Sequence, residues 1–181
     1  MIPCVFFTLL TFIILQTPMV NSNNLINQTC KNSSMNDPNI NYNFCIKAFH
    51  SSPSSRDANL TRLGLISINL VKHNSSNTTS FIKTLIGNHV LDSITKKGLK
   101  DCLELYSNSV STLFEAARDF RAKRLDDANV KVSSVMDDCS TCEDGFDDIG
   151  VFSPLTKQNN DTFQLSAIAL SIIDMLHYYV L

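Results

Sequence analysis

The chain has 181 residues, and its 15 basic and 17 acidic side chains give a formal net charge of −2 at pH 7. No stripe of Lys or Arg appears, which argues against a nucleic-acid partner. The four histidines, His50, His73, His89 and His177, form no close pair of metal ligands, and neither a Gly-x-Ser-x-Gly nor a His-Glu-x-x-His motif occurs. We therefore expect no metal, no cofactor and no catalytic residues.

Residues 1–22 predict a secretory signal peptide. They contain no charged side chain, and the apolar run 5–15 is shorter than the roughly 20 residues of a membrane-spanning helix. Pro18 follows this run, and Val20 and Ser22 are small residues at the −3 and −1 positions of a cleavage site. A signal anchor is the alternative interpretation. The prediction is a secreted, extracellular domain, 23–181, without a membrane partner.

The polar segment 24–52 is expected to form a helical hairpin of its own. Asn36-Asp37-Pro38 marks its turn, and Cys30 and Cys45 flank that turn. The five cysteines after residue 22 allow several pairings, and proximity in the sequence favours Cys30–Cys45. Closing a loop of about 15 residues stabilises a fold by about 3 kcal/mol, which a segment this polar would need.

Four apolar stripes with helical spacing predict four long helices within 55–179. The stretch between Pro53 and Pro154 contains no proline, which permits long helices. The first stripe lies within 56–94 and fits one long helix with a polar kink near 74–79, or two helices. His89 belongs to this stripe, and we expect it to be a hydrogen-bonded core residue.

Three further stripes follow. The second, from Leu99 to Phe120, predicts a helix whose opposite face is solvated and includes Asp119. The third covers 130–146, and the fourth covers 165–176 with an N-cap near Asn160 or Asp161.

Short connections are expected near 95–98 and 123–127, and they favour antiparallel neighbours. No segment alternates with a period of two residues, so no sheet is expected. The predicted fold is all-α, an up-down four-helix bundle preceded by a short disulfide-stapled helical hairpin.

Three cysteines fall within the predicted bundle. Cys102 lies near the start of one helix and Cys142 near the end of the next, so antiparallel packing would bring the two together. A Cys102–Cys142 disulfide closes a loop of about 40 residues and is worth about 4 kcal/mol. Cys139 lies one helical turn from Cys142 and could compete for Cys102. We expect Cys139 to be a buried free thiol, with intermolecular pairing or a mixed disulfide as the alternative.

Sequons of the form Asn-x-Ser/Thr predict surface N-glycans on a secreted chain. The polar stretch 72–80 makes two of them, Asn74 and Asn77, the favoured acceptors. The six candidate sites are Asn27, Asn32, Asn59, Asn74, Asn77 and Asn160.

Three motifs in a fixed order resemble the plant invertase and pectin methylesterase inhibitor family. They are Tyr-x-x-Cys at 42–45, preceded by Cys30, Asp-Cys-x-x-x-Tyr at 101–106, and Thr-Cys-Glu-Asp-Gly-Phe at 141–146. The resemblance implies a helical hairpin packed on a four-helix bundle. It also implies the same two disulfides, Cys30–Cys45 and Cys102–Cys142, with Cys139 in addition to the family's four cysteines.

The same resemblance implies a monomeric inhibitor in the apoplast or cell wall. It would bind stoichiometrically at the cleft of a carbohydrate-active enzyme, namely an acid invertase, which is a plant glycoside hydrolase. Invertase inhibitors of the family carry a Pro-Lys-Phe segment in the connection between two bundle helices and insert it into the substrate cleft of the enzyme. The matching positions are Lys123, Arg124 and Leu125, followed by Asp126 and Asp127. Arg124 would pair with the hydrolase carboxylates.

Three alternatives remain open for the function. The first is a pectin methylesterase inhibitor, which would use the side of the bundle. The second is a secreted hydrolase, although Asp137/Asp138 and Asp147/Asp148 are more typical of solvated helix ends than of a catalytic dyad. The third is a small-ligand carrier, although a bundle interior of Leu, Ile, Val and Phe is by default a packed core.

Overall fold

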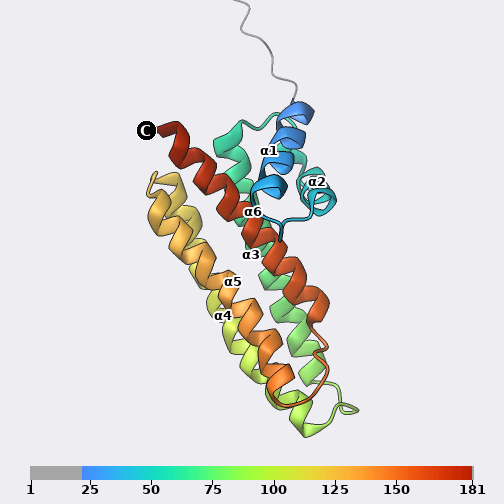
Figure 1. Cartoon of the computed structure of the whole chain (residues 1–181). Helices are drawn as coiled ribbons and strands as arrows, with labels where there is room; N and C mark the ends of the chain where they lie inside the picture. Colours follow the sequence, from blue (N-terminus) through green and yellow to red (C-terminus); the bar gives the residue numbers. More distant parts are fainter. Residues whose placement is uncertain (1–21, 181) are drawn as a thin grey trace, which may run out of the picture.

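The computed structural model describes residues 22–180, and every regular element in that range is helical (Figure 1). This confirms the predicted all-α fold. The predicted signal peptide lies outside the described residues except for Ser22. The elements are α1 (Ser22–Asn36), α2 (Tyr42–His50), the short 3-10 turn η1 (Pro53–Ser55), α3 (Leu60–Ile86), α4 (Ser93–Arg121), α5 (Leu125–Asp148) and α6 (Thr156–Val180).

The last four helices form a closed ring in which each packs against two others. α3 contacts α4, α4 contacts α5, α5 contacts α6, and α6 returns to α3. The chain reverses at each short connection, which gives the predicted up-down bundle. Figure 1 shows the hairpin of α1 and α2 beside one end of the bundle, where it contacts α6 and α3.

Helix α3 is continuous through the polar stretch 74–79, so the single-helix alternative is correct. Hydroxyl groups there bond to the backbone one turn earlier: Thr78 Oγ1 donates to the Asn74 carbonyl at 3.0 Å, and Thr79 Oγ1 to the Ser75 carbonyl at 2.9 Å. Because these side chains find partners inside the helix, they do not interrupt it.

The connection between α3 and α4 lies at 87–92, so its prediction near 95–98 was wrong. Asp92 is the N-cap of α4, and its Oδ1 accepts from the backbone N–H groups of Ile94 at 2.8 Å and Thr95 at 2.9 Å. This cap starts α4 about two turns before its apolar stripe. His89 falls in the connection and is exposed, so its prediction as a core residue was also wrong.

Helix α6 begins at Thr156, one turn earlier than the N-cap predicted near Asn160 or Asp161. The Ser153 hydroxyl accepts from the Leu155 backbone N–H at 3.1 Å and orders the chain just before the helix. The Asn159 backbone N–H already donates to the Leu155 carbonyl at 2.8 Å. The early helix start follows from these local bonds, which the apolar pattern does not record.

Both disulfides are present and buried. Cys30–Cys45 joins α1 to α2 with a Cα–Cα distance of 5.7 Å, and Cys102–Cys142 joins α4 to α5 with 5.0 Å. Cys139 is a free, buried thiol whose Sγ lies 3.1 Å from the Met136 carbonyl. Burial raises the pKa of this thiol to about 12, which keeps it protonated and unreactive at neutral pH. The structure therefore favours the free thiol over an intermolecular disulfide.

Two of the motif residues belong to a polar network that ties three helices together. The buried Tyr106 hydroxyl on α4 donates to Asn159 Oδ1 on α6 at 2.8 Å. Asn159 Nδ2 in turn donates to Glu143 on α5 at 2.5 Å. Buried polar groups cost free energy unless they are paired, so this network fixes how α4, α5 and α6 fit together. Tyr106 and Glu143, which belong to the motifs at 101–106 and 141–146, thus have a structural role.

Side chains of α4 and α6 pack tightly against α3 at Gly64, and we predict that Gly64→Ala is destabilising. A Cβ atom there would lie 2.6 Å from Phe120 Cζ and 3.2 Å from Ile172 Cγ2, both buried. Overpacking a core costs about 1–3 kcal/mol, which outweighs the gain of about 1 kcal/mol in helix propensity. Urea unfolding should show a net loss of about 1 kcal/mol.

Gly145→Ala is the matched control for this prediction. Gly145 also lies inside a helix, but a Cβ atom there meets nothing within 4 Å. This control should stabilise the protein by about 0.5–1 kcal/mol. Equal stabilisation by both substitutions would contradict the tight contact at Gly64.

Candidate functional site

The turn between α4 and α5 is the candidate site, and it is very tight. Only Ala122, Lys123 and Arg124 separate the two helices. The Lys123 N–H donates to the Phe120 carbonyl at 3.0 Å, and the Arg124 N–H donates to the Asp119 carbonyl at 2.9 Å. These two bonds form a Schellman motif, which satisfies the last carbonyl groups of α4. The loop predicted at 123–127 is therefore shorter, because α5 already begins at Leu125.

Lys123 occupies the position of this motif where glycine is usual. Its φ is 61°, the only positive φ of a non-glycine residue within the described part of the chain. The left-handed conformation costs a residue with a Cβ atom about 1–2 kcal/mol. Non-glycine residues kept in such conformations concentrate at functional sites. The strain therefore marks this exposed turn as a candidate binding site.

Asp119 holds the turn together from inside the bundle. Its side chain is 4% exposed, so its prediction as a solvated residue was wrong. It accepts hydrogen bonds from Lys131 Nζ at 2.8 Å and from Arg124 Nη2. Lys131 first, and then Arg124, lower the pKa of the Asp119 carboxyl. The sequence carried one signal: an acidic residue in the last turn of a helix is disfavoured by the helix dipole and so suggests a specific partner.

Arg124 is occupied by carboxylates of its own chain. Besides Asp119, its Nε lies 3.2 Å from Asp127 Oδ2. Lys123, in contrast, is exposed, and no carboxylate of residues 22–180 lies within ion-pair distance of its ammonium group. The turn therefore presents Lys123 to solvent and uses Arg124 as an internal clamp.

The other three predicted contact residues, Leu125, Asp126 and Asp127, lie on the first turn of α5 and differ in exposure. Leu125 is half-buried and packs against the main core. The Asp126 side chain is 95% exposed, and its Oδ1 lies 3.3 Å from His177 Nε2 on α6. Residues 123–127 thus share one end of the bundle, as a contact site requires. Sequence reasoning missed the participation of His177 and Lys131, because only the packing of α6 and α5 brings them there.

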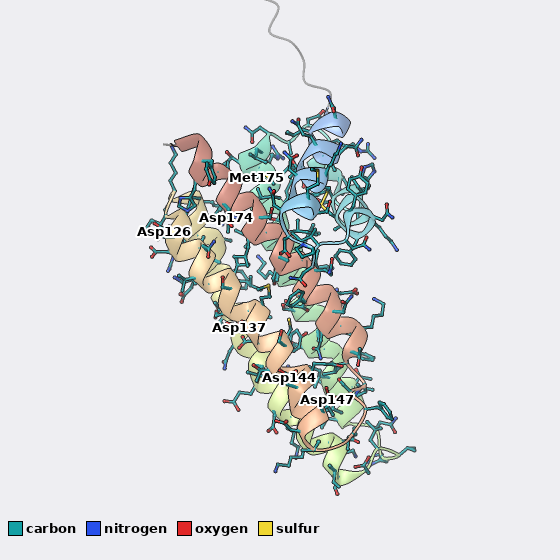
Figure 2. All side chains as sticks on the ribbon, in the orientation of Figure 1. Asp126, Asp137, Asp144, Asp147, Asp174 and Met175 are labelled. Carbon is teal, nitrogen blue, oxygen red and sulfur yellow. A yellow bond between two sulfur atoms is a disulfide. The ribbon has the colours of Figure 1, made fainter. Side chains whose placement is uncertain are left out.

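The helix that follows the turn has an acidic face. Figure 2 shows Asp126 at the start of α5 and Asp137, Asp144 and Asp147 further along it. Lys131 is the one basic residue between Leu125 and Asp148. The cationic turn therefore stands at the end of a negatively charged ridge.

We predict that Asp119→Asn lowers the melting temperature by about 5 °C at pH 5–7. Since the folded state lowers the pKa of Asp119, its stabilising contribution is complete above the unfolded-state pKa of about 3.9. It is lost as the pH falls through the lower pKa of the folded state. The difference from the unmodified protein should therefore shrink below about pH 4, as measured by circular dichroism.

Asp144→Asn serves as the control for this experiment. Asp144 is an exposed carboxylate on the neighbouring helix α5 and makes no ion pair with the residues that the structure describes. It should change the melting temperature by about 1 °C or less. Equal effects of both substitutions at every pH would contradict the role of Asp119.

The predicted glycan acceptors differ in their surroundings. Asn27, Asn32, Asn77 and Asn160 are exposed. Asn59 is the exposed N-cap of α3, and its Oδ1 accepts from the Arg62 backbone N–H at 2.9 Å. Asn74 is half-buried, and its Nδ2 donates to Thr162 Oγ1 at 2.8 Å. The Asn77 amide also has a partner, His73 Nε2 at 3.2 Å, but Asn77 is exposed, so it is the better candidate of that pair.

The described residues contain no set of three or more His, Cys, Asp or Glu side chains arranged to hold a metal ion. No helix between residues 22 and 180 is both long and apolar enough to span a bilayer. Asp138, a member of one acidic pair, accepts from the Ser109 hydroxyl at 2.7 Å and so links α5 to α4.

Comparison with known proteins agrees with these features. The chain is 42% identical over 174 residues to "Putative invertase inhibitor" of Platanus acerifolia, covering 96% of this chain and 95% of that protein. It is 28% identical over 133 residues to "Pectinesterase inhibitor" of Actinidia deliciosa, covering 73% and 68%. The crystal structure of a mutant pectin methylesterase inhibitor from Arabidopsis has the same fold, with a TM-score of 0.66 at 22% identity over 78% of this chain and 96% of the other.

A family model described as plant invertase/pectin methylesterase inhibitor matches residues 24–172. That range contains the hairpin, both disulfides and the turn between α4 and α5. The chain therefore belongs to the plant invertase/pectin methylesterase inhibitor family.

Proposed function

We propose that the protein is a secreted, monomeric inhibitor that binds an acid invertase at its substrate cleft through the turn between α4 and α5. The observation that carries this proposal is the strained, exposed Lys123 on a turn clamped by Asp119 and Arg124. A rigid protruding turn loses little entropy on binding, which favours tight association. The 42% identity to proteins named as invertase inhibitors supports the choice of target.

Lys123 is the primary contact in this proposal, and Arg124 shapes the turn. A glycoside hydrolase cleft contains paired carboxylates, and an ammonium group held at the tip of the turn can reach them. Arg124 would first have to leave Asp119 and Asp127 before pairing with the enzyme. The buried Asp119 carboxylate would then keep Lys131 as its only close partner, and the loss of one of its two close ion pairs would cost free energy, so we assign the contact to the free cation, Lys123.

A pectin methylesterase is the alternative target, and one feature of the fold favours it. The acidic ridge on α5, with Asp137, Asp144 and Asp147, lies along the side of the bundle (Figure 2). Such a ridge would suit a partner with a basic surface. Relatives named as pectinesterase inhibitors match the chain at 26–31% identity, so we keep a pectin methylesterase as the second candidate target.

Titration of the secreted protein against both purified enzymes at about pH 5 tests the proposal. We expect activity of the acid invertase to fall linearly to zero near one inhibitor per enzyme, while the pectin methylesterase keeps its activity. The reverse pattern would select the alternative target. Inhibition of neither enzyme would overturn the assignment as an inhibitor. Sequencing of the secreted N-terminus and sedimentation analysis check signal cleavage and the monomeric state.

A further inference from the structure

A second surface feature is a groove at the seam between the hairpin and the bundle, away from the α4–α5 turn. It follows α2 and η1 on one side and α3 and α6 on the other. Two cavities of about 350 and 450 Å³ form it, and Ser51, Leu70 and His73 line both. Ligand sites in proteins commonly have volumes of this size. The groove is therefore large enough for an extended ligand rather than a single small ion.

Positive charge predominates in this groove. Lys47 comes from α2, His73 from α3 and Lys157 from α6. Lys157 pairs with Asp161, the only acidic residue along either cavity. No carboxylate of residues 22–180 lies within 4.0 Å of Lys47 or His73 nitrogen atoms. Lys47 is thus an ammonium group without a carboxylate partner among the described residues, in a chain whose net charge is −2, whereas the His73 ring lies 3.2 Å from the Asn77 amide.

The rest of the lining combines hydroxyl and amide groups with an apolar floor. Ser51, Ser52 and Ser54 form one wall, and Asn69 lies opposite on α3. Phe44, Ala48, Leu70 and Leu165 provide the apolar part. A purely apolar ligand would make no hydrogen bonds or ion pairs with the polar residues of the lining. A small inorganic anion would fill only a small part of the groove.

The geometry points to a binding site for an acidic oligosaccharide, a chain of sugar units that carry carboxylates. A carboxylate would pair with Lys47, and a second would accept a hydrogen bond from the His73 ring. Sugar hydroxyl groups would exchange hydrogen bonds with Ser52, Ser54 and Asn69, and ring carbons would cover the apolar floor. This site is independent of the enzyme target, because none of its residues belongs to the α4–α5 turn.

Two predicted glycan acceptors adjoin the groove. Asn74 lines the first cavity, and Asn77 Nδ2 lies 3.2 Å from His73 Nε2. A glycan at either position would cover part of the site. Binding should therefore be measured on the full secreted chain both before and after enzymatic removal of N-glycans.

Calorimetric titration with a linear hexamer of galacturonic acid, at low salt and about pH 5, tests the site. We expect the hexamer to bind about tenfold more tightly than a neutral glucose hexamer of the same length. Replacing both Lys47 and His73 with alanine should weaken binding about tenfold, which corresponds to 1.4 kcal/mol. The matched control replaces Lys83 and Lys97, two exposed lysines outside the groove, and should leave affinity within about twofold.

Four outcomes would overturn the proposal. One is the absence of hexamer binding by the deglycosylated protein, and another is equal weakening by the control lysines, which means unspecific attraction of a polyanion. A third is inorganic phosphate that binds as tightly as the hexamer. The last is a set of amide shifts in the nuclear magnetic resonance spectrum that centres on Arg118, Arg121 and Lys123 instead of on Ser52 and Asn69. Unchanged melting temperatures are required of every variant that is compared.

Discussion

Replacing both Cys102 and Cys142 with alanine is expected to lower the free energy of unfolding by about 4 kcal/mol. The disulfide closes a loop of 40 residues and joins α4 to α5 with a Cα–Cα distance of 5.0 Å. Without it, the unfolded chain gains the conformational entropy of that loop. Both cysteines are buried in one apolar cluster with Tyr106, Phe146 and Cys139, so their removal also loosens that cluster. Since small domains have only about 5–15 kcal/mol of stability, this is a large share.

Urea unfolding of the double variant and of Cys139→Ala measures this effect. Cys139 lies in the same core but forms no disulfide, so its loss should cost only about 1 kcal/mol. Both the unmodified protein and the double variant should show one titratable thiol per denatured chain, whereas Cys139→Ala should show none. A double variant as stable as Cys139→Ala would contradict the entropic contribution. If neither the unmodified protein nor the double variant shows a titratable thiol, Cys139 forms a disulfide between chains.

The helices themselves were predictable because their apolar stripes are long and regular. The stripe from Leu99 to Phe120 lies within α4, and the stripe from 130 to 146 lies within α5. Such patterns report burial against a core, which is a property of many residues at once. The same pattern favoured Cys102–Cys142, since antiparallel neighbours bring these two cysteines to one level, but it left Cys139 as a competitor that the family resemblance did not include in the pair.

The ends of the helices were less predictable, because single side chains decide them. Asp92 starts α4, and the backbone bonds near Ser153 start α6, in both cases ahead of the apolar residues. The candidate site depended still more on tertiary structure. A sequence pattern placed Asp119 on the solvated face of α4, but α5 covers that position and supplies Lys131 to it. No pattern could show that Arg124 is held and Lys123 is free.

The turn between α4 and α5 should govern inhibition through Lys123, and we predict that Lys123→Glu weakens inhibition by about 10- to 100-fold. The substitution reverses an exposed charge that pairs with no described residue, so stability should change little. In the enzyme cleft the new carboxylate would face other carboxylates, and like charges that are brought together there repel strongly. Inhibition constants and melting temperatures of the same preparations measure both effects.

Arg124→Glu tests the second half of the same argument. The sequence resemblance places Arg124 opposite the hydrolase carboxylates, and on that basis alone the substitution should weaken inhibition at least about tenfold. The structure adds that it also removes the clamp on Asp119 and puts a carboxylate beside Asp127. The melting temperature should therefore fall together with inhibition, unlike that of Lys123→Glu.

Lys123→Gly separates strain from charge. Glycine adopts the φ of 61° without cost, so this variant should be about 0.5–1 kcal/mol more stable while it loses the cation. If Lys123 serves to contact the partner enzyme, the Lys123→Gly variant should be more stable than the unmodified protein but inhibit more weakly. If both Lys123 variants inhibit as well as the unmodified protein, while the Arg124 variant does not, the arginine makes the contact and must leave its clamp to do so. If all three inhibit normally, the turn lies outside the interface, and the acidic ridge on α5 becomes the surface to test.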